Sequence, residues 1–158
     1  MDYHSVMLET LNYIRLFQDL KPDQVVQLDP LFERLNFTVN ETLFAQGEPA
    51  KYLYILLKGN AVITYKPYDG PAITLTRLQP GDVFGWSAVV GSAQYTSGSI
   101  SVSHVEVARV LASDLWQFVR DHPETGEFLL NRIASSVSTR WKDAHVQVQA
   151  MLDKGRST

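Results

Sequence analysis

The side chains between residues 85 and 103 suit the binding of a small polar ligand, but none of them carries a positive charge. The stretch contains seven Ser or Thr residues and three glycines, and no Lys or Arg occurs between Arg77 and Arg109. The seven are Ser87, Ser92, Thr96, Ser97, Ser99, Ser101 and Ser103, and the glycines are Gly85, Gly91 and Gly98. Hydroxyls and backbone N–H groups can hold a neutral or weakly anionic ligand, and the rings of Trp86 and Tyr95 can stack on it. The alternation also fits a strand over 97–103 whose serines face solvent while Ile100 and Val102 point inward.

The other polar residues show no catalytic or metal-binding pattern. The histidines are His4, His104, His122 and His145, and no two of them have metal-ligand spacing. The chain has no HExxH, GxSxG or P-loop motif. It also has no cysteine, which excludes disulfides, thiol nucleophiles and zinc fingers. We therefore expect a non-catalytic protein without metal or other cofactor.

The elements that must position these residues are predicted to form one domain over 1–158. A chain of 158 residues and 17.8 kDa matches one domain, since domains commonly have about 100–200 residues. We expect N-terminal helices over 1–35, a β-roll over 36–112 and C-terminal helices over 113–158.

The middle segment predicts a mainly β fold of the jelly-roll (double-stranded β-helix) type. Short runs rich in β-branched and aromatic residues alternate with turn signals. The runs cover 42–45, 52–58, 61–66, 72–78, 83–84, 97–103 and 105–111. Many short strands at this spacing favour a sandwich, jelly roll or barrel of about eight strands. Metal cupins share this layout, but no His follows the turn Pro80-Gly81-Asp82 until His104.

The C-terminal segment predicts a long helix near 124–153 with an apolar stripe. Its stripe residues, at alternating spacings of four and three, are Leu130, Ala134, Val137, Trp141, Ala144, Val148 and Met151. This is an a/d seam over three heptads, so we expect a homodimer joined through this helix. The first turns should instead pack on the chain's own barrel through Phe128, Leu129 and Ile133.

Three ordered motifs between residues 47 and 85 resemble the cyclic nucleotide-binding domain of the catabolite-activator (Crp/Fnr-like) type. They are Gly47-Glu-Pro-Ala50, Tyr52-Leu-Tyr-Ile-Leu-Leu-Lys-Gly59 and Leu78-Gln-Pro-Gly81-Asp-Val-Phe-Gly85. The resemblance implies a phosphate-binding cassette over about 84–97, whose short helix at 85–90 directs backbone N–H groups at the cyclic phosphate. It assigns the ligand-binding role to Phe84, Gly85, Trp86, Ser87, Ala88, Tyr95, Thr96 and Ser97.

Two cassette positions depart from the family pattern. In nucleotide-binding members a Glu that holds the ribose follows Phe-Gly, and here that position is Trp86, whose ring is expected to fill the ribose space. The phosphate-binding Arg of the family falls on Tyr95, or on Thr96 if the loop differs by one residue. Loss of that guanidinium removes the strongest charge-assisted contact of such a site.

We therefore expect a sensor or regulatory module with a degenerate cassette that does not bind cAMP or cGMP in the usual way. Two alternatives stay open. One is a signalling domain that holds a cyclic nucleotide or another small ligand through backbone amides and Ser/Thr hydroxyls. The other is a metal-free cupin-like enzyme.

Composition also bears on partners and location. With 14 Lys and Arg against 17 Asp and Glu, the net charge is −3. A protein that binds many nucleic-acid phosphates usually has an excess of basic residues. Only 154–158 follow the predicted long helix, too few for a recognition helix, so no direct DNA binding is expected. No signal-peptide or membrane-spanning pattern is visible. We expect a cytoplasmic protein whose partners are a second copy, a small molecule or another protein.

Overall fold

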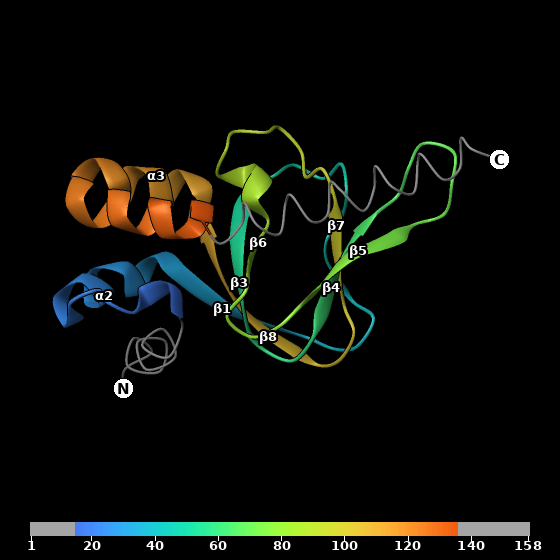
Figure 1. Ribbon diagram of the computed structural model, residues 1–158, viewed down its shortest axis with the longest axis horizontal. Helices are drawn as coiled ribbons and strands as arrows, with labels where there is room; N and C mark the ends of the chain where they lie inside the picture. The colour runs from blue at the N-terminus through green and yellow to red at the C-terminus, as the bar shows by residue number, and fades with distance from the viewer. Residues whose placement is uncertain (1–14, 136–158) are drawn as a thin grey trace.

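The computed structural model of the chain describes residues 15–135 as two β-sheets with helices on one side (Figure 1). The elements before the sheets are η1 (Arg15–Phe17), α2 (Pro22–Leu28) and η2 (Asp29–Leu31). The strands are β1 (Phe32–Phe37), β2 (Thr42–Phe44), β3 (Tyr52–Lys58), β4 (Ala61–Tyr65), β5 (Ile73–Leu78), β6 (Val83–Phe84), β7 (Gly98–Ser101) and β8 (Val105–Leu111). The short helix η3 (Trp86–Ala88) lies between β6 and β7, and α3 (Ala112–Asp121) follows β8.

The strands pair in two antiparallel sheets of four. The first sheet has the order β1-β8-β3-β6, and the second has the order β2-β7-β4-β5. Most neighbours within a sheet are distant in sequence, as in a jelly roll. The predicted fold class is therefore confirmed.

The first sheet buries both of its faces. Its inward face and that of the second sheet enclose an inner core, which consists of Leu43, Phe44, Tyr54, Leu56, Ala61, Leu78, Phe84, Ala88, Tyr95, Val105 and Val107. Its other face packs against the helices in an outer core, which consists of Leu16, Phe17, Val25, Leu28, Leu53, Ile55, Val83, Val89, Ala108, Val110, Leu115, Phe118, Leu129 and Ile133. Strand side chains alternate between faces, so Tyr54 and Leu56 point into the inner core while Leu53 and Ile55 point into the outer core. Helices α2 and α3 lie on the outer-core side of this sheet (Figure 1).

The N-terminal helical segment is shorter than expected. Strand β1 begins at Phe32, although helices were predicted to extend to residue 35. Its sequence, Phe-Glu-Arg-Leu-Asn-Phe, is half polar and therefore weak as a strand signal. Pairing with β8 over all six residues stabilises it as an edge strand.

The described part of the C-terminal segment begins at Ala112, one residue earlier than predicted. Helix α3 has Leu111 as its N-cap. The chain bends at His122 and is helical again over 123–135. A Cβ on Gly126 would lie 2.6 Å from Val119 Cα, so the two helices need a glycine where they meet.

Only the beginning of the predicted dimer helix can be compared with the structure. Leu129 and Ile133 are buried in the outer core, as expected, whereas Phe128 is 36% exposed. Leu130 is partly buried against the same core, and Ala134 is exposed. Val137, Trp141, Ala144, Val148 and Met151 lie outside the described residues. Within 15–135, no helix is long and apolar enough to cross a bilayer.

Candidate ligand-binding site

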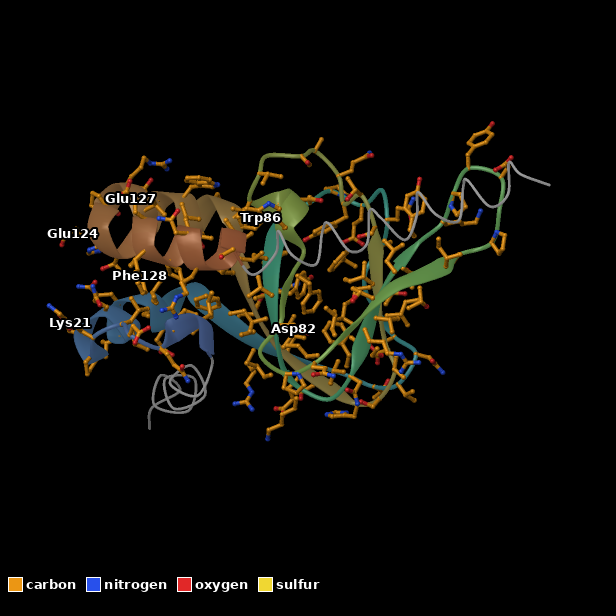
Figure 2. All side chains as sticks on the ribbon, viewed as in Figure 1. Lys21, Asp82, Trp86, Glu124, Glu127 and Phe128 are labelled. Carbon is orange, nitrogen blue, oxygen red and sulfur yellow. The ribbon has the colours of Figure 1, made fainter. Side chains whose placement is uncertain are left out.

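The Pro-Gly-Asp turn positions the start of the cassette. Gly81 has φ +95°, and the Asp82 carboxylate accepts a hydrogen bond from Gln79 N at 2.7 Å. Backbone bonds from Leu56 N to Asp82 O (2.9 Å) and from Gly81 N to Leu56 O (2.7 Å) hold this turn beside β3. Asp82 and Trp86 lie at opposite ends of β6 (Figure 2), so the turn determines where the cassette leaves the sheet.

The cassette itself begins with a single helical turn. Gly85 has φ +80°, and a Cβ there would lie 3.0 Å from Tyr52 O, so only glycine fits well. Residues 86–88 form the 3-10 helix η3, with Val89 N and Val90 N donating to Trp86 O. The expected helix at 85–90 is therefore present as one tight turn.

Trp86 and Ala88 leave η3 toward different cores. The Trp86 side chain packs against the outer core, on the side of the cassette that faces the helices (Figure 2). The expectation that this ring fills the ribose space stays a prediction. Because η3 is only one 3-10 turn, Ala88 points into the inner core and Trp86 points away from it.

Tyr95 is buried and fully engaged by its own domain. It is 3% exposed, and its ring stacks on Phe44 at a centroid distance of 4.1 Å. Its hydroxyl donates to Tyr52 O at 2.6 Å and accepts from Tyr52 N at 3.0 Å. Burial raises the pKa of Tyr95 to about 12, so the hydroxyl stays protonated at neutral pH. It therefore has no donor left for a ligand phosphate.

The backbone around Tyr95 is also tied to the loop that follows β2. Tyr95 N donates to Glu48 O at 2.9 Å, and Gly47 N donates to Tyr95 O at 2.9 Å. Ala50 N donates to Ala93 O at 3.1 Å. These bonds hold the end of the cassette against residues 45–50.

The remaining predicted cassette residues fall into two groups. Phe84 is buried in the inner core, where its ring stacks on Tyr54 at 5.3 Å. Ser87 Oγ and Thr96 Oγ1 are 3.5 Å apart and link the two ends of the cassette near the surface. Ser97 is partly buried. Among these hydroxyl residues, Ser87 and Thr96 are brought together in reach of solvent.

The serines of β7 face the opposite way from the solvent-facing arrangement considered above. Ser99 and Ser101 are 0% exposed, whereas Ile100 is partly exposed and Val102 is 45% exposed. Ser99 lies opposite Phe44 of β2 and Ile63 of β4. These neighbours are bulky and point inward, so small serine side chains fit between them.

The two inward serines differ in their hydrogen bonds. Ser101 Oγ donates to Thr38 O and accepts from Glu41 N at 2.8 Å. Ser99 Oγ is buried and has no hydrogen-bond partner among the described residues. A buried hydroxyl without a partner is unusual and can serve a bound molecule.

The structure also reveals a group of residues that sequence reasoning did not assign to the site. Arg109 lies 3.8 Å above the Tyr52 ring and pairs with Glu33 at 2.5 Å. Arg77, the other arginine that borders the stretch without positive charge, is exposed on β5 opposite Val62. The sequence signal for an inward Arg109 was the two-residue spacing of apolar and aromatic residues on one strand face. These residues are Tyr52 and Tyr54 on β3 and Val105 and Val107 on β8, which Arg109 follows. In 15–135, no three His, Asp or Glu residues are grouped so that they could hold a metal ion.

Comparisons with known proteins agree with this architecture. The family model described as "Cyclic nucleotide-binding domain" matches residues 34–122. A CRP-like cAMP-activated global transcriptional regulator from Mycobacterium tuberculosis is 30% identical over 81% of this chain and 57% of its own length. A lysophospholipase from Kluyveromyces lactis is 29% identical over 68% of this chain and 8% of its own length. The chain thus spans little more than half of the M. tuberculosis regulator.

Solved structures show the same fold. A putative cyclic nucleotide-binding protein from Geobacter metallireducens has a TM-score of 0.72 and 25% identity, covering 84% of this chain and 96% of its own. A cyclic nucleotide-binding domain from Methylobacillus flagellatus has a TM-score of 0.79 and 19% identity, covering 95% and 84%. With the family model matching more than half of its residues, this chain belongs to the cyclic nucleotide-binding domain family.

Proposed function

We propose that this chain is a cytoplasmic, non-catalytic regulatory module that does not bind cAMP or cGMP in the usual way. The observation that carries the proposal is Tyr95. The family resemblance assigns this position to the phosphate-binding Arg, but the Tyr95 hydroxyl is committed to both backbone groups of Tyr52.

The expected loss of affinity for cAMP and cGMP follows from the Glu and Arg side chains that are missing at positions 86 and 95. Hydrogen bonds to charged groups contribute about 1.5–3 kcal/mol, against roughly 1 kcal/mol for neutral ones. Trp86 cannot accept a hydrogen bond from a ribose hydroxyl, because its indole nitrogen is only a donor. Losing both contacts weakens binding by several kcal/mol, on the order of a thousandfold.

Titration calorimetry with cAMP and with cGMP tests this function. We expect no binding in the low micromolar range for the natural sequence. A double variant, Trp86→Glu with Tyr95→Arg, should bind cAMP at least tenfold more tightly if its circular dichroism shows that it folds. A dissociation constant below about 10 μM for the natural sequence would refute the proposal.

A second candidate function rests on Ser99. Its buried hydroxyl without a described partner favours a small neutral ligand held by hydroxyls and backbone amides. A thermal-shift panel with cAMP, cGMP and cyclic dinucleotides separates the two, since a ligand that binds the native state raises the unfolding temperature. A shift that Ser99→Ala abolishes would favour this second function.

We also propose that the chain acts as a homodimer. The support is the apolar seam that begins at Leu130, which is partly buried against the outer core, and continues at Ala134, which is exposed. Light scattering at micromolar concentration should give about twice 17.8 kDa. Charged substitutions at Val137 and Val148 should yield the monomer, and a dimer that both substitutions leave intact would refute the seam.

A further inference from the structure

Arg109 is a basic side chain directed into the barrel rather than away from it. On β8 it follows Val105 and Val107 at the two-residue spacing of one strand face, and both valines belong to the inner core. Its cross-strand partners are Glu33 of β1 and Tyr54 of β3, and Tyr54 in turn lies opposite Phe84 of β6. These four residues therefore lie in one row across the inward face of the first sheet, and Arg109 is the cation in that row.

Other basic residues on the described strands are on outward faces. Arg34 and Lys58 both pair with Glu106, at 2.8 and 3.2 Å, on the face that carries Ala108. Arg77 is exposed opposite Val62. Among the Lys and Arg residues of β1–β8, Arg109 alone is directed toward the inner core.

The contacts of Arg109 hold its guanidinium in place and leave part of it accessible. Its side chain is 23% exposed, lies over the Tyr52 ring at 3.8 Å and is hydrogen-bonded to Glu33. Burial acts to lower the pKa of Arg109, but the hydrogen bonds and charges of Glu33 and Tyr54 outweigh it and the pKa is raised. The group is therefore a permanent cation with a fixed orientation.

Glu33 is an exchangeable partner for this cation. Its side chain is 52% exposed, and one of its oxygens accepts from Arg109 Nε at 2.5 Å. A carboxylate that is half in solvent contributes little to an ion pair, because water competes for it. An incoming carboxylate or phosphate can therefore take its place on the guanidinium, which matches both groups geometrically.

This cation lies at the same end of the barrel as the cassette. Arg109 lies over the ring of Tyr52, and the backbone N and O of Tyr52 are hydrogen-bonded to the Tyr95 hydroxyl. A Cβ on Gly85 would lie 3.0 Å from Tyr52 O and 3.6 Å from Tyr95 Cε1. Arg109, Tyr52, Tyr95 and Gly85 therefore form one continuous group.

We propose that Arg109 is the anion anchor of this domain and that the barrel end beside the cassette binds a small organic anion, a carboxylate or a phosphate ester, which displaces Glu33. This proposal rests on the regulatory function proposed above, since it names the ligand class of the same site. Tyr52 orients the guanidinium, and Glu33 occupies the anion position until the ligand arrives.

The test compares anions with their neutral counterparts. The probes are 5′-AMP against adenosine for the phosphate source and benzoate against benzamide for the carboxylate source. Binding is followed by the Arg109 Nε–H signal in nitrogen-edited NMR and by calorimetry. We expect at least one anion to give a saturable shift at millimolar concentration, and its neutral counterpart to give none.

Three variants identify the anchor. Arg109→Met should weaken binding of the anion about 10- to 100-fold, and Arg109→Lys should retain part of it, since Lys keeps the charge but loses the fork. Glu33→Gln removes the competing carboxylate and should tighten binding about tenfold. Arg77→Met is the matched control and should leave binding unchanged. Arg109→Lys and Glu33→Gln keep the proposal testable if Arg109→Met fails to fold.

The outcomes separate this proposal from the proposed function. No saturable binding of either anion to the natural sequence or to Glu33→Gln overturns the anchor. Anion binding that responds equally to changes at Arg109 and Arg77 also overturns it, and leaves the proposed function intact. Tight binding of cAMP that Arg109→Met abolishes would refute the proposed function and support the anchor.

Discussion

Replacing Tyr95 with Phe tests whether its hydroxyl belongs to the fold rather than to a ligand. The substitution keeps the stacked ring and removes the hydrogen bonds of 2.6 and 3.0 Å to Tyr52. Each bond contributes about 0.5–1.5 kcal/mol, so the free energy of unfolding should fall by about 1–3 kcal/mol. For a chain of this size, about 2 kcal/mol corresponds to a melting temperature roughly 4–8 °C lower.

Urea unfolding followed by circular dichroism measures this loss. The matched control is Tyr68→Phe, because Tyr68 is completely exposed, and its effect should stay within about ±0.5 kcal/mol. If Tyr95→Phe is no more destabilising than Tyr68→Phe, the Tyr95 hydroxyl is not bonded to the backbone, and the case against a phosphate contact at this position fails.

The pH dependence gives a second measurement on the same variant. The pKa of Tyr95 is raised to about 12 in the folded state, whereas a free tyrosine has a pKa of 10.0. Between these values the unfolded chain loses a proton that the folded chain keeps, so the contribution of Tyr95 is complete below pH 10 and decreases as the pH rises toward 12. The stability difference between the natural sequence and Tyr95→Phe should therefore shrink from pH 9 to pH 11. A constant or growing difference would contradict the raised pKa.

Three further tests, with five substitutions, concern the positions that shape the site. Gly85→Ala should destabilise the fold by about 1–3 kcal/mol more than Gly81→Ala in urea unfolding, since both have positive φ but only a Cβ on Gly85 would approach within 4 Å of other residues; equal losses would refute the steric argument. Ser99→Ala should be neutral or stabilising, whereas Ser101→Ala should cost about 1–3 kcal/mol, because only Ser101 has partners among the described residues; a comparable loss at both sites would mean that Ser99 is bonded. Trp116→Phe removes the bond from Trp116 Nε1 to Val89 O at 3.0 Å and should cost about 1 kcal/mol by thermal unfolding, with the unchanged melting temperature as the contrary result.

Much of the fold could be predicted because turn glycines and short apolar runs are local signals. Gly47, Gly59, Gly81 and Gly85 all have positive φ, as their places in the motifs implied. Strand β1 could not be predicted from its own residues. Its charged residues Glu33 and Arg34 form ion pairs with Arg109 and Glu106 on β8, which are distant in sequence.

The candidate site was less predictable, because the sequence determines alternation but not which face is inside. Ser99 and Ser101 were placed at the surface and are buried, since Phe44 and Ile63 on the neighbouring strands take up the inner volume. Trp86 packs on the outer core and Ala88 in the inner core, a difference that depends on the length of η3 rather than on the residue pattern. Arg109 was recognised as a cation, but its inward direction follows only from the register of β8.

The bonds around Tyr95 have a consequence for how fast anything can enter the barrel from the cassette side. Two hydroxyl bonds join Tyr95 to Tyr52, and backbone bonds from Tyr95 to Glu48 and Gly47 and from Ala50 to Ala93 join the end of the cassette to residues 45–50. Tyr95 takes part in all but the last of these, so the segment opens as one cooperative unit rather than by fraying. The amide hydrogens of Gly47, Ala50 and Tyr95 should then exchange with solvent at a common rate. That opening rate is the ceiling on ligand association from this side, however tightly the closed site binds.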